Sequence, residues 1–186
     1  AGMPVMEGKC VLFKAFGDVD AWPVPLDRCR QGGADRGKTD PDRVIDATAA
    51  LAGMYGGINL EDIAAPACFE IEDRLDAMLD IPVFHDDQWG TAVITLAGVI
   101  NYARLAERDL AELRVVINGA GAAGIRICEM LKAAGVTHLL LCDSKGVIRH
   151  ARSDLSGKKR EHAAATSAAT LDDALQGAHV FIGVSA

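Results

Sequence analysis

The sequence contains a glycine-rich run whose spacing suits the binding of a dinucleotide. Residues 119–124 read GAGAAG, which matches the pattern G-x-G-x-x-G, and the run separates a β-branched stretch from a helical pattern. In such a turn Gly119 allows the sharp bend, Gly121 lets the backbone approach a pyrophosphate, and Gly124 lets the helix pack on the strand. The N–H groups at the start of the helix then donate to phosphate oxygens.

An acidic residue follows this turn at the distance that dinucleotide binding requires. Asp143 ends the next predicted strand, 19 residues after Gly124, and can accept hydrogen bonds from a ribose hydroxyl of NAD. Lys145 could instead bind the 2′-phosphate of NADP, so the choice of nucleotide stays open. A tight turn that binds no ligand is the alternative, and the strand and the acid both disfavour it. The predicted cofactor-binding residues are Gly119, Ala120, Gly121, Ala122, Ala123, Gly124, Asp143 and Lys145.

Carboxylates are concentrated upstream of this turn. Residues 61–87 hold nine of them against one arginine, and two adjacent pairs, Glu61-Asp62 and Asp86-Asp87, directly follow predicted strands. If the strands are parallel neighbours, both pairs meet at one edge, where a cation must offset their repulsion. Oxygen ligands suit Mg²⁺ or Mn²⁺. The alternative is that the pairs are ordinary first-turn acids of helices, and the other five acids are expected on a solvated helix face.

The elements that must position these residues alternate between strand and helix. This order predicts an α/β fold with a parallel sheet covered by helices on both faces. The long apolar helix at about 91–106 is expected to be buried on several sides. Helices are predicted at about 4–16, 41–54, 66–79, 91–106, 122–134 and 172–176, and strands at 19–24, 58–60, 81–84, 115–118, 139–142 and 180–184.

Composition excludes several classes of protein. The net charge of -7 argues against a nucleic-acid partner, which usually requires a basic face. No apolar run approaches the roughly 20 residues needed to span a bilayer, so no membrane is expected. Five cysteines without a CxxC pair indicate reduced thiols in the cytoplasm. Because no start methionine is present and the last strand stops without a following element, we expect an internal fragment.

Six segments in order resemble the bacterial malic enzymes. They are PVMEGK at 4–9, GINLED at 57–62, IPVFHDDQ at 81–88, GT at 90–91, NGAGAAG at 118–124 and DSKG at 143–146. The resemblance implies that Lys9 takes the proton from the 2-hydroxyl of malate as hydride leaves for the nicotinamide. It also implies that Glu61, Asp62 and Asp87 bind the metal and that Asp86 lies beside the lysine.

The resemblance implies a complete chemistry and architecture. Malate would be oxidised to oxaloacetate, would lose CO₂ and would be protonated to pyruvate, with reduction of NAD or NADP and with Mg²⁺ or Mn²⁺ as Lewis acid. Residues 1–88 would end a domain that carries the lysine and the metal, and residues 89–186 would begin an incomplete Rossmann-type dinucleotide-binding domain. The partners implied are malate and a second copy of the chain, in a homodimer or a larger homo-oligomer.

The chain departs from the family pattern at three places. The proton-donating tyrosine of the family lies upstream of the lysine, and no residue of this chain matches it. Trp89 stands where many relatives carry histidine, beside a predicted metal ligand, and residues 27–39 resemble a surface insertion. We expect the fragment itself to be poorly active.

Two other functions remain as alternatives to a malic enzyme. One is a Rossmann-type dehydrogenase that acts on another hydroxy acid or an amino acid without a metal, which the paired acids after both early strands disfavour. The other is a nucleotide-binding domain without catalysis. Dependence of malate oxidation on a divalent metal separates these possibilities.

Overall fold

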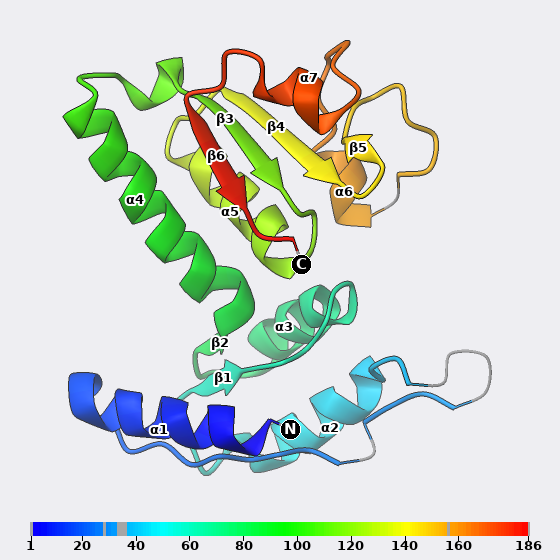
Figure 1. The fold of residues 1–186 in the computed structure, drawn as a ribbon. Helices are drawn as coiled ribbons and strands as arrows, with labels where there is room; N and C mark the ends of the chain where they lie inside the picture. The colour runs from blue at the N-terminus through cyan, green and yellow to red at the C-terminus, as the bar shows by residue number, and fades with distance from the viewer. Residues whose placement is uncertain (1, 28, 33–36, 156, 186) are drawn as a thin grey trace. The chain divides into compact units, whose positions relative to one another are not determined.

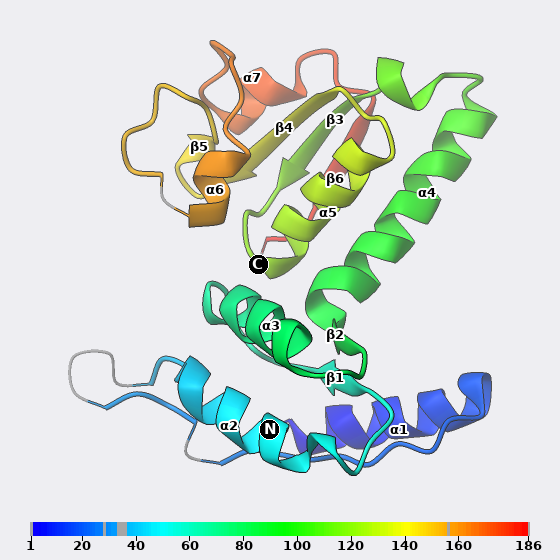
Figure 2. The same ribbon diagram turned by 180° about the vertical axis from the view of Figure 1, so that it is seen from behind.

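The chain forms two compact units, residues 1–84 and 85–186 (Figures 1 and 2). The computed structural model describes residues 2–27, 29–32, 37–155 and 157–185. None of the described helices is both long and apolar enough to cross a membrane. The predicted insertion at 27–39 lies partly outside the described residues; in its described part, Gln31 N donates to Lys38 O at 2.8 Å.

The first unit holds three helices and a small sheet. Helix α1 (Met3–Gly17) has Pro4 in its first turn and ends where Asp18 adopts a φ of 50°. Helix α2 (Pro41–Ala52) begins at a proline, and the side chain of Asp40 caps it by accepting from Arg43 N. A proline in the first turn costs no hydrogen bond, which explains why both helices begin where the sequence predicted.

The core of the first unit lies between α2 and α3 (Ala67–Met78) and the strand β1 (Ile58–Leu60). Strand β2 (Val83–His85) forms a two-stranded sheet with β1. Arg74 on α3 pairs with Asp42 on α2 at 2.7 Å, outside the core. The buried residues of this core are Val44, Ile45, Leu60, Ile71 and Leu75.

Two predictions for the first unit were wrong. Residues 19–24, all of which are described, form no strand. Pro23 lacks the N–H donor that a ladder needs, and so does Pro25 directly after this stretch. Of the five acids expected on the solvated face of α3, Glu72 is buried, with 4 % of its surface exposed. Its position between Ile71 and Leu75 places it on the helix face that packs into the core.

The second unit contains a four-stranded sheet in the order β5-β4-β3-β6. Strand β3 (Arg114–Asn118) lies parallel to both β4 (His138–Asp143) and β6 (Val180–Gly183), whereas the short β5 (Gly146–Val147) is antiparallel to β4. Helix α5 (Ala122–Ala133) lies behind the sheet in Figure 1, and α7 (Leu171–Leu175) lies on the opposite face. This confirms the predicted α/β fold with a parallel sheet between helices.

Helix α4 (Thr91–Leu105) packs along α5, but it is less buried than its sequence suggested. Its buried residues are Ala92, Val99 and Ala103, whereas Ile94 and Leu105 are 76 % and 87 % exposed. The prediction that this helix is buried on several sides is therefore wrong for the described chain, because only the face with small side chains lies against α5. Two short helices complete the unit, the 3₁₀ turn η3 (Leu110–Glu112) and α6 (Gly157–Glu161).

Candidate active site

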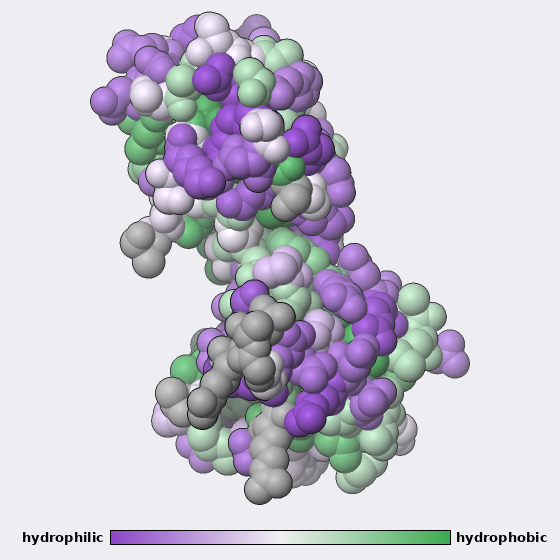
Figure 3. All heavy atoms as spheres, turned by 90° about the vertical axis from the view of Figure 1, so that its right-hand side faces the viewer, coloured by the Kyte–Doolittle hydropathy of each residue, from purple (hydrophilic) through white to green (hydrophobic). Residues whose placement is uncertain are grey.

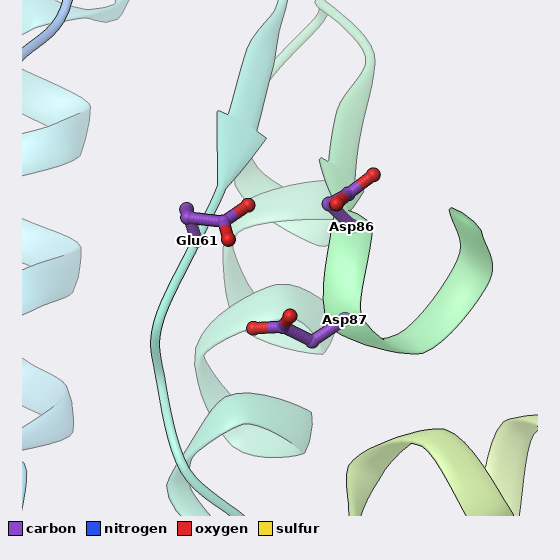
Figure 4. A group of neighbouring side chains, drawn as sticks. All are labelled: Glu61, Asp86 and Asp87. Atoms are coloured by element: carbon purple, nitrogen blue, oxygen red, sulfur yellow. The ribbon is translucent and has the colours of Figure 1, made fainter. Parts of the chain in front are cut away.

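Three carboxylates gather where strands β1 and β2 end. Glu61 directly follows β1, and Asp86 and Asp87 directly follow β2. One oxygen from each residue lies within 4.8 Å of the others. Figure 4 shows the carboxylates of Glu61 and Asp87 turned toward each other, with Asp86 beside them. Carboxylates this close repel one another, and a divalent cation with a preference for oxygen ligands would offset the repulsion.

Pairing of the two strands produces this gathering. Ile58 N donates to Pro82 O at 2.9 Å, which joins the beginning of β1 to the segment that leads into β2. The two strands then end close together, and the acids that follow each strand meet there. The sequence predicted that the two acidic pairs would meet at one edge, and the structure brings one member of the first pair together with both members of the second.

Asp62, the third metal ligand that the resemblance implies, does not belong to this group of three in the described chain. Its φ of 57° places its backbone in the left-handed region, directly after Glu61. Asp62 remains a predicted ligand that the structure does not test.

Lys9 reaches the carboxylate group from helix α1. Its Nζ lies 3.0 Å from Oε2 of Glu61, and the two side chains are 26 % and 10 % exposed. A surface lysine would hold its ammonium group in water, whereas this one is held against a largely buried acid. The structure therefore brings the predicted base and one predicted metal ligand into direct contact.

The chain leaves β2 through a π-helical turn, η2 (Asp86–Gly90), that the sequence did not predict. The turn contains both Asp86 and Asp87. A Cβ added to Gly90 would lie 2.6 Å from Oδ1 of Asp86, so the glycine lets this carboxylate fold back against the end of the turn. Single π-helical turns often occur at functional sites, and here one presents two of the three clustered acids.

The glycine-rich turn between β3 and α5 has the geometry that its sequence predicted. Gly119 has a φ of 123°, in the left-handed region that favours glycine, and an added Cβ would lie 2.7 Å from the carbonyl carbon of Val184. An added Cβ on Gly124 would overlap with the carbonyl oxygen of Gly119. Both positions therefore require glycine, the first for its backbone and the second for close packing of the helix.

The start of α5 fits a phosphate group. Gly121 is the residue before the helix, and no side chain of the described residues caps it. An added Cβ on Gly121 would meet no described atom within 4 Å, so the space beside it is open. The first N–H groups of a helix need acceptors, and phosphate oxygens supply them. Ala120 lies in the turn, and Ala122 and Ala123 form the first turn of the helix.

Asp143 ends β4, as predicted, but its carboxylate already has strong partners. Arg152 binds it through two hydrogen bonds of 2.8 and 3.1 Å, and Lys159 donates at 3.0 Å. Burial alone would raise the pKa of Asp143. The bonds from Arg152 and Lys159 and from the backbone N–H of Lys145 outweigh burial and lower the pKa to about 2. Asp143 is therefore ionised at neutral pH.

Two cations near the predicted ribose position were missed by sequence reasoning. Arg152 and Lys159 bind Asp143, and Nζ of Lys145 lies 2.9 Å from Asp154, which Arg152 also contacts. Spacing alone could not place them, although the basic residues of 149–160 were a usable signal. Hydrophilic residues gather on the face of the second unit that carries β5, α6 and α7 (Figure 3).

Comparison with known families matches both units. Residues 1–76 match the family "Malic enzyme, N-terminal domain". Residues 89–186 match the family "Malic enzyme, NAD binding domain". The "Probable NADP-dependent malic enzyme" of Rickettsia prowazekii is 49 % identical over the whole chain, which covers 23 % of that protein. The "Bifunctional malic/malolactic enzyme" of Bacillus subtilis is 45 % identical, and the chain covers 44 % of it.

Solved structures are similar in fold as well as in sequence. The NAD-dependent malic enzyme of Thermotoga maritima superposes with a TM-score of 0.89 at 40 % identity, over all of this chain and 48 % of that one. The malic enzyme of Entamoeba histolytica gives a TM-score of 0.90 at 38 % identity, over 99 % of this chain and 39 % of that one. The chain thus spans less than half the length of these relatives. The protein belongs to the malic enzyme family.

Proposed function

We propose that this protein catalyses the oxidative decarboxylation of malate to pyruvate and CO₂, with reduction of NAD or NADP. The observation that carries the proposal is the contact between Lys9 and Glu61 within the carboxylate group at the ends of β1 and β2. An amine held against clustered acids has the elements of a base beside a metal site. The glycine-rich turn before α5 supplies the place for a dinucleotide.

A Mg²⁺ or Mn²⁺ ion would be held by Glu61 and Asp87, which face each other. The third carboxylate is Asp62 in the set that the resemblance implies and Asp86 in the set that the structure groups. When bound, such an ion supplies Lewis-acid polarisation of a carbonyl and a carboxylate, which eases loss of CO₂ from a β-keto acid. The acidic, oxygen-rich character of this group fits such an ion.

Lys9 has two tasks in the proposed reaction. It orients malate by accepting the hydrogen bond of the 2-hydroxyl, and it removes that proton while hydride passes from C2 to the nicotinamide. The electron pair of the O–H bond forms the carbonyl of oxaloacetate. Lys9 accepts a proton only in its neutral form, so its ion pair with Glu61 must be given up before it acts. A cation held by Glu61 would favour this by competing for the carboxylate.

The dinucleotide would be held by the glycine-rich turn and by the acid at the end of β4. Gly119 and Gly124 set the turn, and the N–H groups after Gly121 would donate to the pyrophosphate. We propose Ala120, Ala122 and Ala123 as further contacts. Asp143 and Lys145 are proposed to lie beside the adenosine ribose.

We also propose the following organisation for the protein. Residues 1–88 carry the lysine and the carboxylates, and residues 89–186 carry the dinucleotide site; the ranges of the two family matches support this division. The five cysteines are free thiols, which supports a reducing, cytoplasmic setting. Exposed apolar side chains on α1, such as Val11, Leu12 and Phe16, support a homodimer or a larger homo-oligomer. Sedimentation of the full-length protein measures its assembly.

A steady-state assay of the full-length protein tests the proposed function. Malate, Mn²⁺ and either NAD or NADP are supplied, and reduced nicotinamide, CO₂ and pyruvate are measured in equal amounts if the proposal is correct. Chelation of the metal should abolish turnover, and added Mn²⁺ should restore it. Oxidation of malate without release of CO₂, or at an unchanged rate after exhaustive chelation, would contradict the proposal.

A further inference from the structure

Arg126 is a buried cation that joins two parts of the second unit. It lies in the second turn of α5 and is 7 % exposed. Its Nε donates to Oε1 of Gln88 at 2.8 Å, and its Nη1 donates to Oε2 of Glu129 at 2.7 Å. Its Cζ lies 4.5 Å from the centre of the Trp89 ring. Two of these three partners belong to the π-helical turn η2.

Glu129 compensates the charge of Arg126, and Arg126 in turn orients the amide of Gln88. A buried guanidinium needs a compensating acid, and Glu129 supplies it from the next turn of the same helix. Burial acts to raise the pKa of Glu129, but its bond with Arg126 outweighs this and lowers the pKa. Because Nε of an arginine can only donate, the oxygen of the fully buried Gln88 amide must face it. Arg126 therefore sets the orientation of Gln88.

Gln88 and Trp89 directly follow Asp86 and Asp87 in the turn. The guanidinium of Arg126 contacts Gln88 and Trp89, and it thereby holds the short backbone segment that also carries Asp86 and Asp87. Gly90 belongs to the same turn, and Oδ1 of Asp86 packs closely against it, 2.6 Å from the position of an added Cβ. The two carboxylates are thus held on a segment whose far end is fastened to α5.

The start of α5, one turn before Arg126, is the proposed phosphate site. The helix starts directly after Gly121, and Gly124 is packed against Gly119 only two residues before Arg126. One rigid helix therefore meets the dinucleotide at its start and the turn η2 at its side.

We propose that Arg126 is a positioning residue that couples the binding of the dinucleotide to the binding of the divalent cation. The inference rests on the function proposed above. Dinucleotide binding at the start of α5 holds the helix, Arg126 holds Gln88 and Trp89, and Asp86 and Asp87 are thereby placed for the ion. By thermodynamic linkage, the ion tightens dinucleotide binding by the same factor.

The test measures binding of Mn²⁺ to the full-length protein by calorimetric titration, with and without saturating NADP. The readout is the ratio of the two dissociation constants. A substitution that only changes the net charge alters the dissociation constant of Mn²⁺ equally with and without NADP. The ratio of the two constants therefore measures the coupling alone. We expect NADP to tighten Mn²⁺ binding by about fivefold or more in the unaltered protein, as is usual for coupled sites.

Two variants break the contact in different ways. Arg126→Lys keeps a positive charge for Glu129, but a single ammonium cannot also reproduce the directed bond to Gln88 and the stacking on Trp89. Gln88→Met keeps the volume and removes the acceptor. In both we expect the ratio to fall to within about twofold of one, with the fold intact by circular dichroism. Arg104→Met, at an exposed arginine near the end of α4, is the matched control and should keep the full ratio.

The outcomes separate this inference from the proposed function. If the unaltered protein binds Mn²⁺ and NADP but the ratio is one, or if both Arg126→Lys and Gln88→Met keep the full ratio, the coupling role of Arg126 is wrong while the proposed function stands. If the unaltered protein binds neither Mn²⁺ nor NADP, the proposed function fails and the inference fails with it. Should Arg126→Lys not fold, the ratio in Gln88→Met decides alone.

Discussion

The side-chain nitrogen of Lys9 lies 3.0 Å from Oε2 of Glu61, although the two residues come from different elements of the first unit. Lys9 belongs to helix α1, and Glu61 directly follows strand β1. The same glutamate contributes an oxygen to the group with Asp86 and Asp87. The carboxylate of Glu61 thus contacts both the amine of Lys9 and the acids that follow β2, so a change in its charge or position would affect both.

Replacing Lys9 by methionine should remove turnover and leave dinucleotide binding nearly unchanged. The variant keeps the length of the side chain but cannot accept a proton, and loss of a general base usually lowers kcat by about 10²- to 10⁴-fold. Steady-state rates with malate and a fluorescence titration with NADPH measure the two effects. Lys14→Met, at an exposed lysine of the same helix that pairs with Asp18 and Asp20, should behave as the unaltered protein. Lost nucleotide binding in Lys9→Met would show that Lys9 is structural.

Glu61→Gln and Asp87→Asn should each weaken Mn²⁺ binding by at least about tenfold, because each amide removes a negative charge from the proposed site. Electron paramagnetic resonance of free Mn²⁺ measures the change. Asp76→Asn is the control, at an exposed acid of helix α3. An unchanged titration in Asp87→Asn would remove this residue from the ligands.

A second pair of variants identifies the third ligand. Asp62→Asn should weaken Mn²⁺ binding more than Asp86→Asn if the set implied by the resemblance is correct. The opposite order would favour the group that the structure brings together, Glu61, Asp86 and Asp87. The same resonance measurement, made on the two proteins side by side, distinguishes the two sets.

Gly124→Ala should weaken NADP binding by about tenfold or more. Its new Cβ would overlap with the carbonyl oxygen of Gly119 and force the dinucleotide turn apart. Gly98→Ala is the matched control in helix α4, where an added Cβ would meet no described atom within 4 Å. Because alanine is a better helix former than glycine, the control should raise the free energy of unfolding by about 0.5–1 kcal/mol. Normal NADP binding by Gly124→Ala would mean that the turn does not hold the pyrophosphate.

The cations around Asp143 predict how the protein distinguishes NADP from NAD. Lys159→Ala should lower kcat/KM for NADP by about tenfold more than for NAD, because only NADP carries a 2′-phosphate that an ammonium can bind. Lys158→Ala removes the same charge from the neighbouring position, which faces Glu129 and Glu161, and should affect both nucleotides alike. Equal losses with both nucleotides in Lys159→Ala would exclude a role in this choice.

Asp143 should contribute to stability in acid. Its pKa is about 2 in the folded chain against an ordinary value of 3.8, so the unfolded chain binds the proton first as pH falls. The contribution is present in full above about pH 4 and is lost as pH falls toward 2. Urea unfolding between pH 5 and pH 2.5 should therefore show a shallower dependence on pH in Asp143→Asn than in the unaltered protein. The same dependence of the free energy of unfolding on pH in both proteins would contradict the lowered pKa of Asp143.

The elements around the dinucleotide turn were predictable from the sequence, because local signals agree there. The β-branched run at 115–118, the glycines after it and the apolar spacing of α5 all point to the same strand, turn and helix. The meeting of Glu61 with Asp86 and Asp87 followed from the rule that ligands gather where strands end.

Other features depend on contacts distant in sequence and were not predictable. The bond from Arg126 to Gln88 joins residues 38 positions apart, and no spacing rule connects them. The π-helical turn at Asp86–Gly90 has no sequence signature of its own. The partners of Asp143 come from the segment after β5, whose path the sequence does not reveal. The exposed face of α4 was mispredicted because apolar composition alone does not show how much of a helix its neighbours cover.

In a deep mutational scan, position 90 should accept other residues only where the side chain of Asp86 can rotate away, and the backbone of Gly90 is not the reason. Gly90 has a φ of -59° and a ψ of -48°, a conformation that every amino acid adopts readily. The restriction comes from the carboxylate of Asp86, whose Oδ1 would lie 2.6 Å from an added Cβ. A combinatorial library that varies positions 86 and 90 together should recover compensating pairs, in which a shorter residue at 86 accompanies alanine or serine at 90.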